Sequence, residues 1–177
     1  TIFSLWDTYR AAHPLFTIID PERVNDFVKT MLTIYDQQGS LPVWHLMGNE
    51  TGTMVGNHSI PVIADAWFKG IGDFDAEKAL LAMKNTATRD DGDGLRWLTE
   101  MEYIPADKER ESVSKAQEYA VDDWCIAQMA RAMGKADDAA LIDKRAGYYR
   151  HYFDPQVGFI RGKNLDGSWS EPFHPVF

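Results

Sequence analysis

Six segments with helical character, each bounded by residues that start or stop helices, constrain the fold of this chain more than any other feature. The clearest pattern lies at 21–38, where apolar residues recur at spacings of three and four and form one face. Asp20 is a suitable N-cap before that segment, and Gly39 is a suitable stop after it. Pro14 is expected to end the first helix, and Ser59 is expected to cap the third. The six helices are predicted at 3–13, 21–38, 59–70, 76–88, 113–133 and 138–153.

Long and short loops alternate between these helices, and this rhythm of helix pairs indicates an all-α fold. An α/α toroid, in which outer helices wrap inner helices around an axis, fits the rhythm, although no sequence repeat is visible. A small C-terminal β-hairpin is predicted at 158–169, where Asp166-Gly167 lies between apolar residues. Two irregular segments remain, at 40–58 and 89–110, and a long loop in a compact domain is often functional.

The charge balance argues against one large class of partners. The 177 residues include 27 acidic and 18 basic ones, for a net charge of −9, whereas nucleic acid or an anionic membrane surface requires a basic patch. No apolar run of about 18 residues is present, so no membrane span is expected. Cys125 is the single cysteine, which excludes an internal disulfide and a cysteine-based zinc site. The length suits one domain, and the apolar ends without an initiator Met lead us to expect part of a larger polypeptide.

The stretch 44–58 has the highest density of chemically useful side chains. It contains one carboxylate, two histidines, two asparagines, three glycines and a tryptophan. Glycines permit tight turns, and loops on a rigid scaffold often carry function. Glu50 lies at the centre without a basic neighbour in sequence, a setting in which a protonatable catalytic acid could be held.

Metal and nucleophile chemistry are less well supported than carboxylate chemistry. His45 and His58 lack the spacing of helical zinc ligands. The run at 90–94 resembles a calcium loop in composition but lacks the EF-hand spacing, which favours a solvated turn. Cys125 lies in an apolar helical run and is expected to be structural. Glycoside hydrolysis needs two carboxyl groups, and the candidates are Glu50, Glu102, Glu111, Glu118, Asp122 and Asp123.

Five motifs carry a family resemblance, and they follow one another along nearly the whole chain. They are F-S-L-W-D-T-Y-R-A-A-H-P-L at 3–15, G-N-E-T-G-T-M-V-G-N-H-S-I-P-V-I-A-D-A at 48–66, E-Y-I-P-A-D at 102–107, S-V-S-K-A-Q-E-Y-A-V-D-D-W-C-I-A at 112–127 and G-F-I-R-G-K-N-L-D-G-S-W-S-E-P-F at 158–173. Together they closely resemble the glycoside hydrolase family 92 α-mannosidases.

The resemblance implies a calcium-dependent, inverting exo-α-mannosidase that removes terminal mannose, α-1,2-linked mannose among others, from mannose-containing glycans. Such enzymes are usually exported by bacteria, so a periplasmic or extracellular location is expected. Their (α/α)6 barrel follows an N-terminal β-sandwich. Residues 1–177 would therefore be a partial (α/α)6 catalytic domain without that sandwich or the downstream half of the barrel, and the rest of the parent polypeptide would be their partner.

The resemblance also implies residue roles. Glu50 would be the general acid, and Glu102, His58, Trp44 and Asp7 would bind substrate. Glu102 is similar to a glutamate that contacts the leaving sugar in α-1,2-cleaving members, but Met101 stands where those members have histidine. The general base belongs to an acidic motif further downstream, so residues 1–177 alone are expected to lack α-mannosidase activity. The resemblance assigns no calcium ligand within the chain.

Two other functions stay open from the sequence. The acidic and aromatic content also suits another (α/α)6-toroid glycosidase, such as a glucosidase, because carboxylates supply the chemistry and aromatic rings stack on sugars. A non-catalytic helical module that binds glycan or protein is the second alternative.

Overall fold

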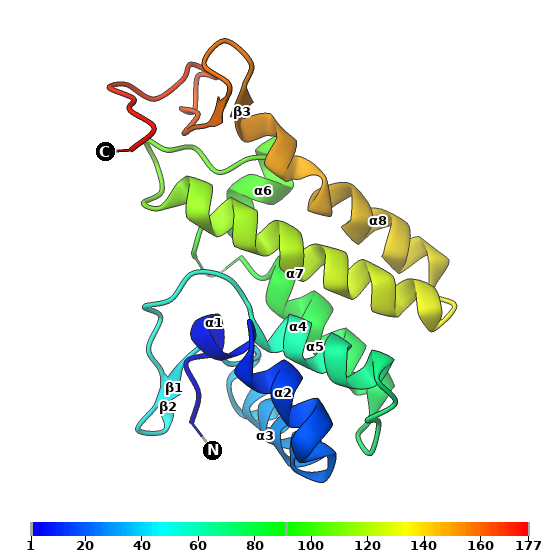
Figure 1. Ribbon diagram of the computed structural model, residues 1–177. Helices are drawn as coiled ribbons and strands as arrows, with labels where there is room; N and C mark the ends of the chain where they lie inside the picture. Colours follow the sequence, from blue (N-terminus) through cyan, green and yellow to red (C-terminus); the bar gives the residue numbers. More distant parts are fainter. Residues whose placement is uncertain (1, 91, 177) are drawn as a thin grey trace.

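The computed structural model describes residues 2–90 and 92–176 and is mainly helical (Figure 1). The predicted all-α class is confirmed, since the described strands form only two short antiparallel hairpins. The elements in chain order are α1 (Leu5–Thr8), α2 (Ala12–Ile19), α3 (Pro21–Gln38), β1 (His45–Leu46), β2 (Asn49–Glu50), α4 (Ser59–Phe68), α5 (Ala76–Thr88), α6 (Leu95–Met101), α7 (Ser112–Ala132), α8 (Ala136–Ala146), the 3-10 helix η1 (Tyr148–Tyr152), β3 (Phe153–Asp154) and β4 (Phe159–Ile160).

Helix α7 organises the molecule. It has 21 residues, crosses the centre of the view in Figure 1, and packs against α4, α5 and α8. The main hydrophobic core draws its buried side chains chiefly from α3, α4, α5, α7 and α8. A second, smaller cluster joins α6, the start of α7 and η1 through Leu95, Leu98, Tyr103, Ile104, Ala116, Tyr119 and Tyr152.

Local signals set the bounds of the best-predicted helices. Asp20 accepts a hydrogen bond from the Arg23 amide at the start of α3, and Gly39 ends that helix with a φ of 83°. Asp75 caps α5 in the same way through the Lys78 amide. These side chains satisfy amide groups that have no partner inside the helix, and glycine adopts the left-handed φ without strain. The predictions of 21–38 and 76–88 are confirmed.

The prediction at the N-terminus is wrong in its bounds. Pro14 does not end a helix at 3–13, because the chain forms the short α1 and then α2, with Pro14 in the first turn of α2. A proline is tolerated there since the amide that it lacks would have no partner within the helix. Ser59 is not the cap of α4 either, since its hydroxyl donates to the Pro42 carbonyl and His58 occupies the N-cap position.

Two further segments differ from their predictions. The segment 89–110, expected to be irregular, contains α6, and the predicted helix at 138–153 is α8 followed by η1 and β3. The C-terminal hairpin is confirmed in part. Strand β4 pairs with the earlier β3. Lys163 and Trp169 form an isolated antiparallel β-bridge on either side of the turn that contains Asp166-Gly167. No helix within the described residues is long and apolar enough to cross a membrane.

Candidate functional site

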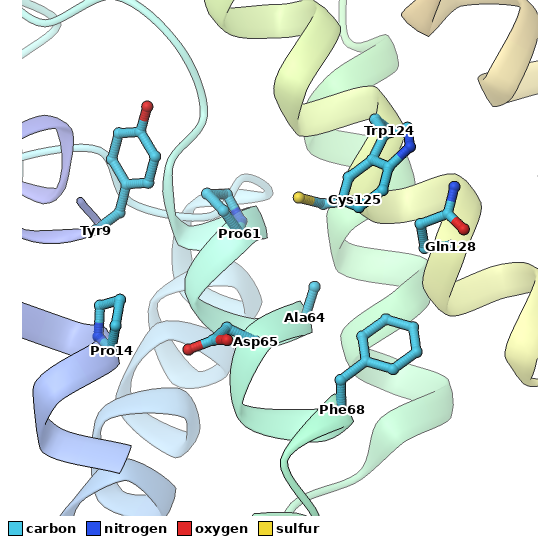
Figure 2. A pocket seen from close by; sticks show the side chains of 9 residues that line it. All are labelled: Tyr9, Pro14, Pro61, Ala64, Asp65, Phe68, Trp124, Cys125 and Gln128. Carbon is cyan, nitrogen blue, oxygen red and sulfur yellow. The ribbon is translucent and has the colours of Figure 1, made fainter. Parts of the chain in front are cut away.

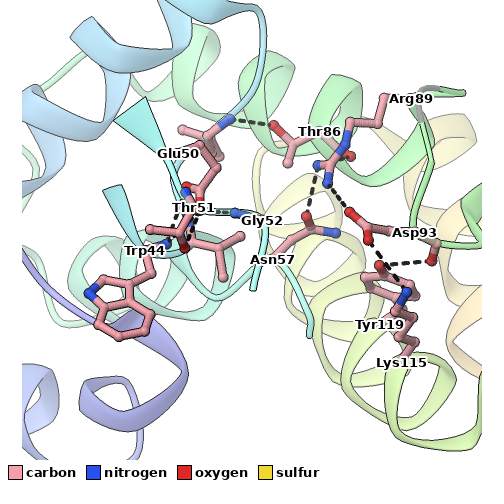
Figure 3. Close-up of polar contacts among 12 residues, drawn as sticks. Trp44, Glu50, Thr51, Gly52, Asn57, Thr86, Arg89, Asp93, Lys115 and Tyr119 are labelled. Atoms are coloured by element: carbon pink, nitrogen blue, oxygen red, sulfur yellow. Dashed lines mark hydrogen bonds and ion pairs between the residues drawn. The ribbon is translucent and has the colours of Figure 1, made fainter. Parts of the chain in front are cut away.

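The Glu50 carboxylate ties together the loop at 43–52. Its Oε2 accepts from the backbone N–H of Val43 at 2.7 Å, and its Oε1 accepts from the amides of Thr51 at 2.9 Å and Gly52 at 3.3 Å. The Trp44 amide contacts both oxygens, at 3.1 and 3.2 Å (Figure 3). These hydrogen bonds hold the carboxylate against the backbone of the loop and fix the shape of the loop around it.

The segment that carries Asp7 is attached to the same loop. The Leu5 amide donates to the Val43 carbonyl at 3.0 Å, while the Val43 amide donates to Glu50. The Asp7 side chain is exposed and accepts from the Ser4 hydroxyl at 2.6 Å. Trp44 is half-buried at the start of the loop. The structure therefore brings three predicted site residues, Asp7, Trp44 and Glu50, into one region.

His58 lies behind this region and not on its surface. Its side chain is fully buried, and its ring stacks on Tyr9 with centroids 4.2 Å apart. Nδ1 lies 3.2 Å from Asp122 Oδ1, and Nε2 lies 3.3 Å from Glu118 Oε2. The ring has no solvent-exposed surface in the observed conformation. The predicted contact between His58 and substrate stays a prediction, and the observed burial of the ring between two carboxylates does not favour it.

Glu102 lies elsewhere in the molecule. It follows α6, which lies near η1 and the C-terminal segment in Figure 1, clearly apart from the hairpin that carries Glu50. Its carboxylate pairs with Lys144 at 2.7 Å and His151 at 3.4 Å. The hydrogen bond from Lys144 lowers the pKa of Glu102. The structure thus does not join Glu102 to the other predicted residues.

Asn57 connects the loop to a second polar cluster. Its side-chain oxygen accepts from Arg89 at 2.9 Å, and Arg89 also pairs with Asp93 at 3.4 Å (Figure 3). Asp93 in turn pairs with Lys115. The carboxylate of Asp93 is thereby engaged by two cations, while Asp91 of the same run lies outside the described residues.

The described residues do not build a metal site from side chains of the usual kinds. No group of three or more histidine, cysteine, aspartate or glutamate residues in the described part of the chain could hold an ion. The Asp93 ion pairs account for one of the acids in the 90–94 run. Calcium therefore has no side-chain cluster of its own within residues 2–90 and 92–176, and calcium dependence stays a prediction.

Asp122 and Asp123 of α7 have different partners, and both are buried. Asp122 faces His58, and burial raises its pKa against the hydrogen bonds from His58 and Asn57. Asp123 pairs with Arg145 at 3.2 Å, and burial raises its pKa to about 7. Burial also raises the pKa of Cys125 to about 12, which agrees with a structural thiol.

Sequence reasoning missed how Glu118 and Asp122 act together. They are four residues apart on one helix, a spacing that places both on the same face. Each was considered as an isolated catalytic candidate. The partner that they share, His58, is 60 and 64 positions away in the sequence, beyond the reach of any local pattern.

Comparisons with known proteins identify the family. The sequence model of the glycosyl hydrolase family 92 catalytic domain matches residues 1–176. An uncharacterized secreted glycosidase from Arthroderma benhamiae is 28% identical over 173 residues, which cover 88% of this chain and 22% of that protein.

Solved structures give a closer likeness. A family 92 α-mannosidase from Bacteroides thetaiotaomicron in complex with mannoimidazole is 47% identical with a TM-score of 0.96, over 99% of this chain and 23% of that one. An inverting family 92 mannosidase from the same organism is 36% identical with a TM-score of 0.93, over 97% of this chain and 24% of that one.

The chain therefore spans between 22% and 24% of the length of these relatives. Its helices form part of an (α/α)6 toroid, as predicted. On this likeness and on a family match over nearly its entire length, the chain belongs to glycosyl hydrolase family 92 and is part of the catalytic domain of a glycoside hydrolase.

Proposed function

We propose that the polypeptide to which these residues belong is an inverting exo-α-mannosidase that hydrolyses terminal α-mannosyl linkages of glycans. The observation that carries the proposal is the TM-score of 0.96, at 47% identity over 99% of the chain, with an α-mannosidase. The relative solved as an inverting mannosidase supports the stereochemical outcome. The linkage preference, α-1,2 or another, is to be measured with mannobioses of different linkage.

Asp7 and Trp44 are the proposed sugar contacts of this part of the domain. An exposed carboxylate suits hydroxyl groups, and an indole face suits the apolar face of a sugar ring. The backbone hydrogen bond from the Leu5 amide to the Val43 carbonyl supports a common site for Asp7 and Trp44. Glu102 is proposed for a contact further along the glycan, because its half-buried side chain keeps some exposed surface and lies apart from them.

Proton donation by Glu50 stays a prediction, and its hydrogen bonds favour another role. Four backbone amides converge on its carboxylate. A general acid has to release a proton to a leaving oxygen within hydrogen-bonding reach. We infer that Glu50 instead holds the 43–52 loop, and with it Trp44, in its substrate-binding shape.

Calcium remains part of the proposal, with ligands contributed by residues beyond those described or by backbone and amide oxygens. In such an enzyme the ion would bind sugar hydroxyls through oxygen ligands. The proposed location is extracellular or periplasmic, and it rests on the secreted relative.

The rest of the polypeptide is proposed to pack against this part of the chain at an apolar groove between α2, α4 and α7. A cavity of about 510 Å³ lies there, lined by residues that include Pro61, Phe68 and Trp124 (Figure 2). Trp124 is 55% exposed and Phe68 is 52% exposed. Large exposed apolar side chains that gather in one patch mark an interaction site, and the solved relative with the same fold here is more than four times as long.

The test is hydrolysis by the purified full polypeptide of α-1,2-, α-1,3- and α-1,6-mannobiose, with α-linked glucobioses as controls. NMR of the first sugar released identifies the anomer. The proposal expects α-mannosides alone to be cleaved, with β-mannose as the initial product. Cleavage of glucosides alone would support the toroid glucosidase instead. Calorimetric binding of mannobiose without any hydrolysis would support a binding module.

A further inference from the structure

The Glu118 carboxylate collects hydrogen-bond donors from the segment that contains Asp7. Its Oε1 accepts from Trp6 Nε1 at 3.1 Å and from Arg10 Nη2 at 2.9 Å, and its Oε2 accepts from the Tyr9 hydroxyl at 3.2 Å. The Arg10 guanidinium also lies over both aromatic rings, 4.7 Å from the Trp6 centroid and 4.8 Å from the Tyr9 centroid. One side chain of α7 therefore fixes three side chains of the 6–10 segment.

His58 joins this cluster to the end of the 51–58 loop. The ring lies between Glu118 and Asp122, with each nitrogen facing one carboxylate. A Cβ at Gly56 would come within 2.5 Å of His58 Nε2, so the loop closes on the ring without room for a side chain. Gly56 also has a φ of 86°, which suits glycine.

Asp122 completes the attachment through the backbone. Its Oδ2 accepts from the Asn57 amide at 2.7 Å, and its side chain is buried. Charge-assisted bonds of this kind are stronger than neutral ones and fix geometry. The two carboxylates, one turn apart on a rigid helix, thus hold two separate segments of the site region.

Asp7 is fixed by this arrangement without contacting it. Trp6 on one side and Tyr9 and Arg10 on the other are bound to Glu118, while the Leu5 amide is bound to Val43. The exposed Asp7 side chain lies between these attachments. Its position relative to Trp44 therefore depends on Glu118 on one side and on the 43–52 loop on the other.

We propose that Glu118, supported by His58 and Asp122, is a positioning residue that holds Asp7 against the loop of Trp44 for binding of the terminal mannose. The inference rests on the proposed function, because Asp7 acts on a sugar only if the site binds one. A misplacement of about 1 Å at such a contact lowers activity by about 100-fold. The loss on removing Glu118 should accordingly be about 10- to 100-fold in affinity for a mannose-like ligand.

The experiment uses the full polypeptide and mannoimidazole as the probe, with affinity measured by calorimetry. Glu118→Gln keeps the shape of the side chain but removes the charge, and Tyr9→Phe removes one bond while it keeps the ring against His58. We expect the first to weaken binding by about 10- to 100-fold and the second by a smaller factor. Glu100→Gln, at an exposed glutamate of α6, is the matched control and should bind as the wild type does.

Two further measurements separate positioning from general stability. The combination of Glu118→Gln with Asp7→Asn should bind no more weakly than Asp7→Asn alone, because a residue that acts through Asp7 has no further effect once Asp7 is changed. Hydrogen exchange of peptides from residues 2–11 should rise in Glu118→Gln, and not in Glu100→Gln, with or without ligand. Tyr9→Phe answers the binding question if Glu118→Gln does not fold.

The outcomes keep the two proposals distinct. Wild-type protein that neither binds mannoimidazole nor cleaves α-mannosides would refute the proposed function, and sugar positioning with it. An active wild type whose Glu118→Gln and Tyr9→Phe variants bind within twofold of it would overturn only the positioning role. Additive losses of affinity in the double variant would overturn it as well.

Discussion

Replacement of Glu50 by glutamine tests whether its carboxylate holds a loop or donates a proton. The glutamine amide can present one oxygen to one group of backbone donors, but its NH₂ must then face another group. In the observed geometry that NH₂ would meet either the Val43 amide, now 2.7 Å from Oε2, or the Thr51 amide, now 2.9 Å from Oε1.

The expected cost follows from the bonds lost. A hydrogen bond to a charged group contributes about 1.5–3 kcal/mol, and a buried donor without a partner costs about 1–3 kcal/mol. Glu50 is half-buried, which reduces both contributions. The lost hydrogen bond and the unpaired donor together, both lowered by this partial exposure, give the expected change. We expect the free energy of opening of the 43–52 loop to fall by about 2–4 kcal/mol.

Hydrogen exchange measures this quantity directly, because the donor amides of Val43, Trp44, Thr51 and Gly52 are themselves the probes. At about 1.36 kcal/mol per factor of ten, the change corresponds to roughly 30- to 1,000-fold faster exchange in Glu50→Gln. The control Glu100→Gln should leave these amides unchanged and the stability within about 0.5 kcal/mol of the wild type.

Activity measurements in the full polypeptide make the test decisive. A variant without its general acid loses about 100- to 10,000-fold on an ordinary mannoside, yet retains activity on a dinitrophenyl α-mannoside, whose leaving group departs without a proton. Loss of a loop anchor reduces the cleavage of both substrates by similar factors. Unchanged exchange at 43–52 together with selective activity on the dinitrophenyl substrate would refute our reasoning and establish Glu50 as the acid.

Three further predictions follow from the groove, the buried acid and the ion. Trp124→Ala should destabilise the full polypeptide by about 3–5 kcal/mol if the remaining chain covers the groove; a shift in Tm no larger than that of an exposed-site variant would contradict this. Asp123 has a folded-state pKa near 7, above its ordinary value of 3.8, so its contribution to stability is complete below about pH 4 and is lost as the pH rises towards 7. Asp123→Asn should therefore flatten the dependence of Tm on pH between about 4 and 7, and an unchanged slope would exclude this effect. Chelation with EDTA should abolish α-mannosidase activity and added calcium should restore it, whereas full activity in EDTA would exclude a calcium requirement.

The helical elements were predictable because their signals are local. Helix α3 begins after Asp20 and ends before Gly39, as the sequence pattern predicted. Its apolar face is buried, as the spacing of its apolar residues also predicted. Helix α6 was not predicted because its seven residues carry neither a capping side chain nor a long apolar repeat. Its place is set by packing of Leu95 and Leu98 in the smaller core cluster.

For the candidate site too, some features follow from local sequence and others only from tertiary contacts. The sequence by itself determined the family, the all-α class and the residues rich in sugar-binding chemistry at 44–58, because motifs and periodicity are properties of neighbouring residues. Only the tertiary structure decided that His58 is buried, that Glu102 lies apart from Asp7, and that Glu50 is surrounded by backbone amides. These facts depend on contacts between segments far apart in the chain, such as Glu118 with Arg10 across 108 residues. Burial and hydrogen-bond partners of this kind are fixed by packing, and packing leaves no local pattern in the sequence.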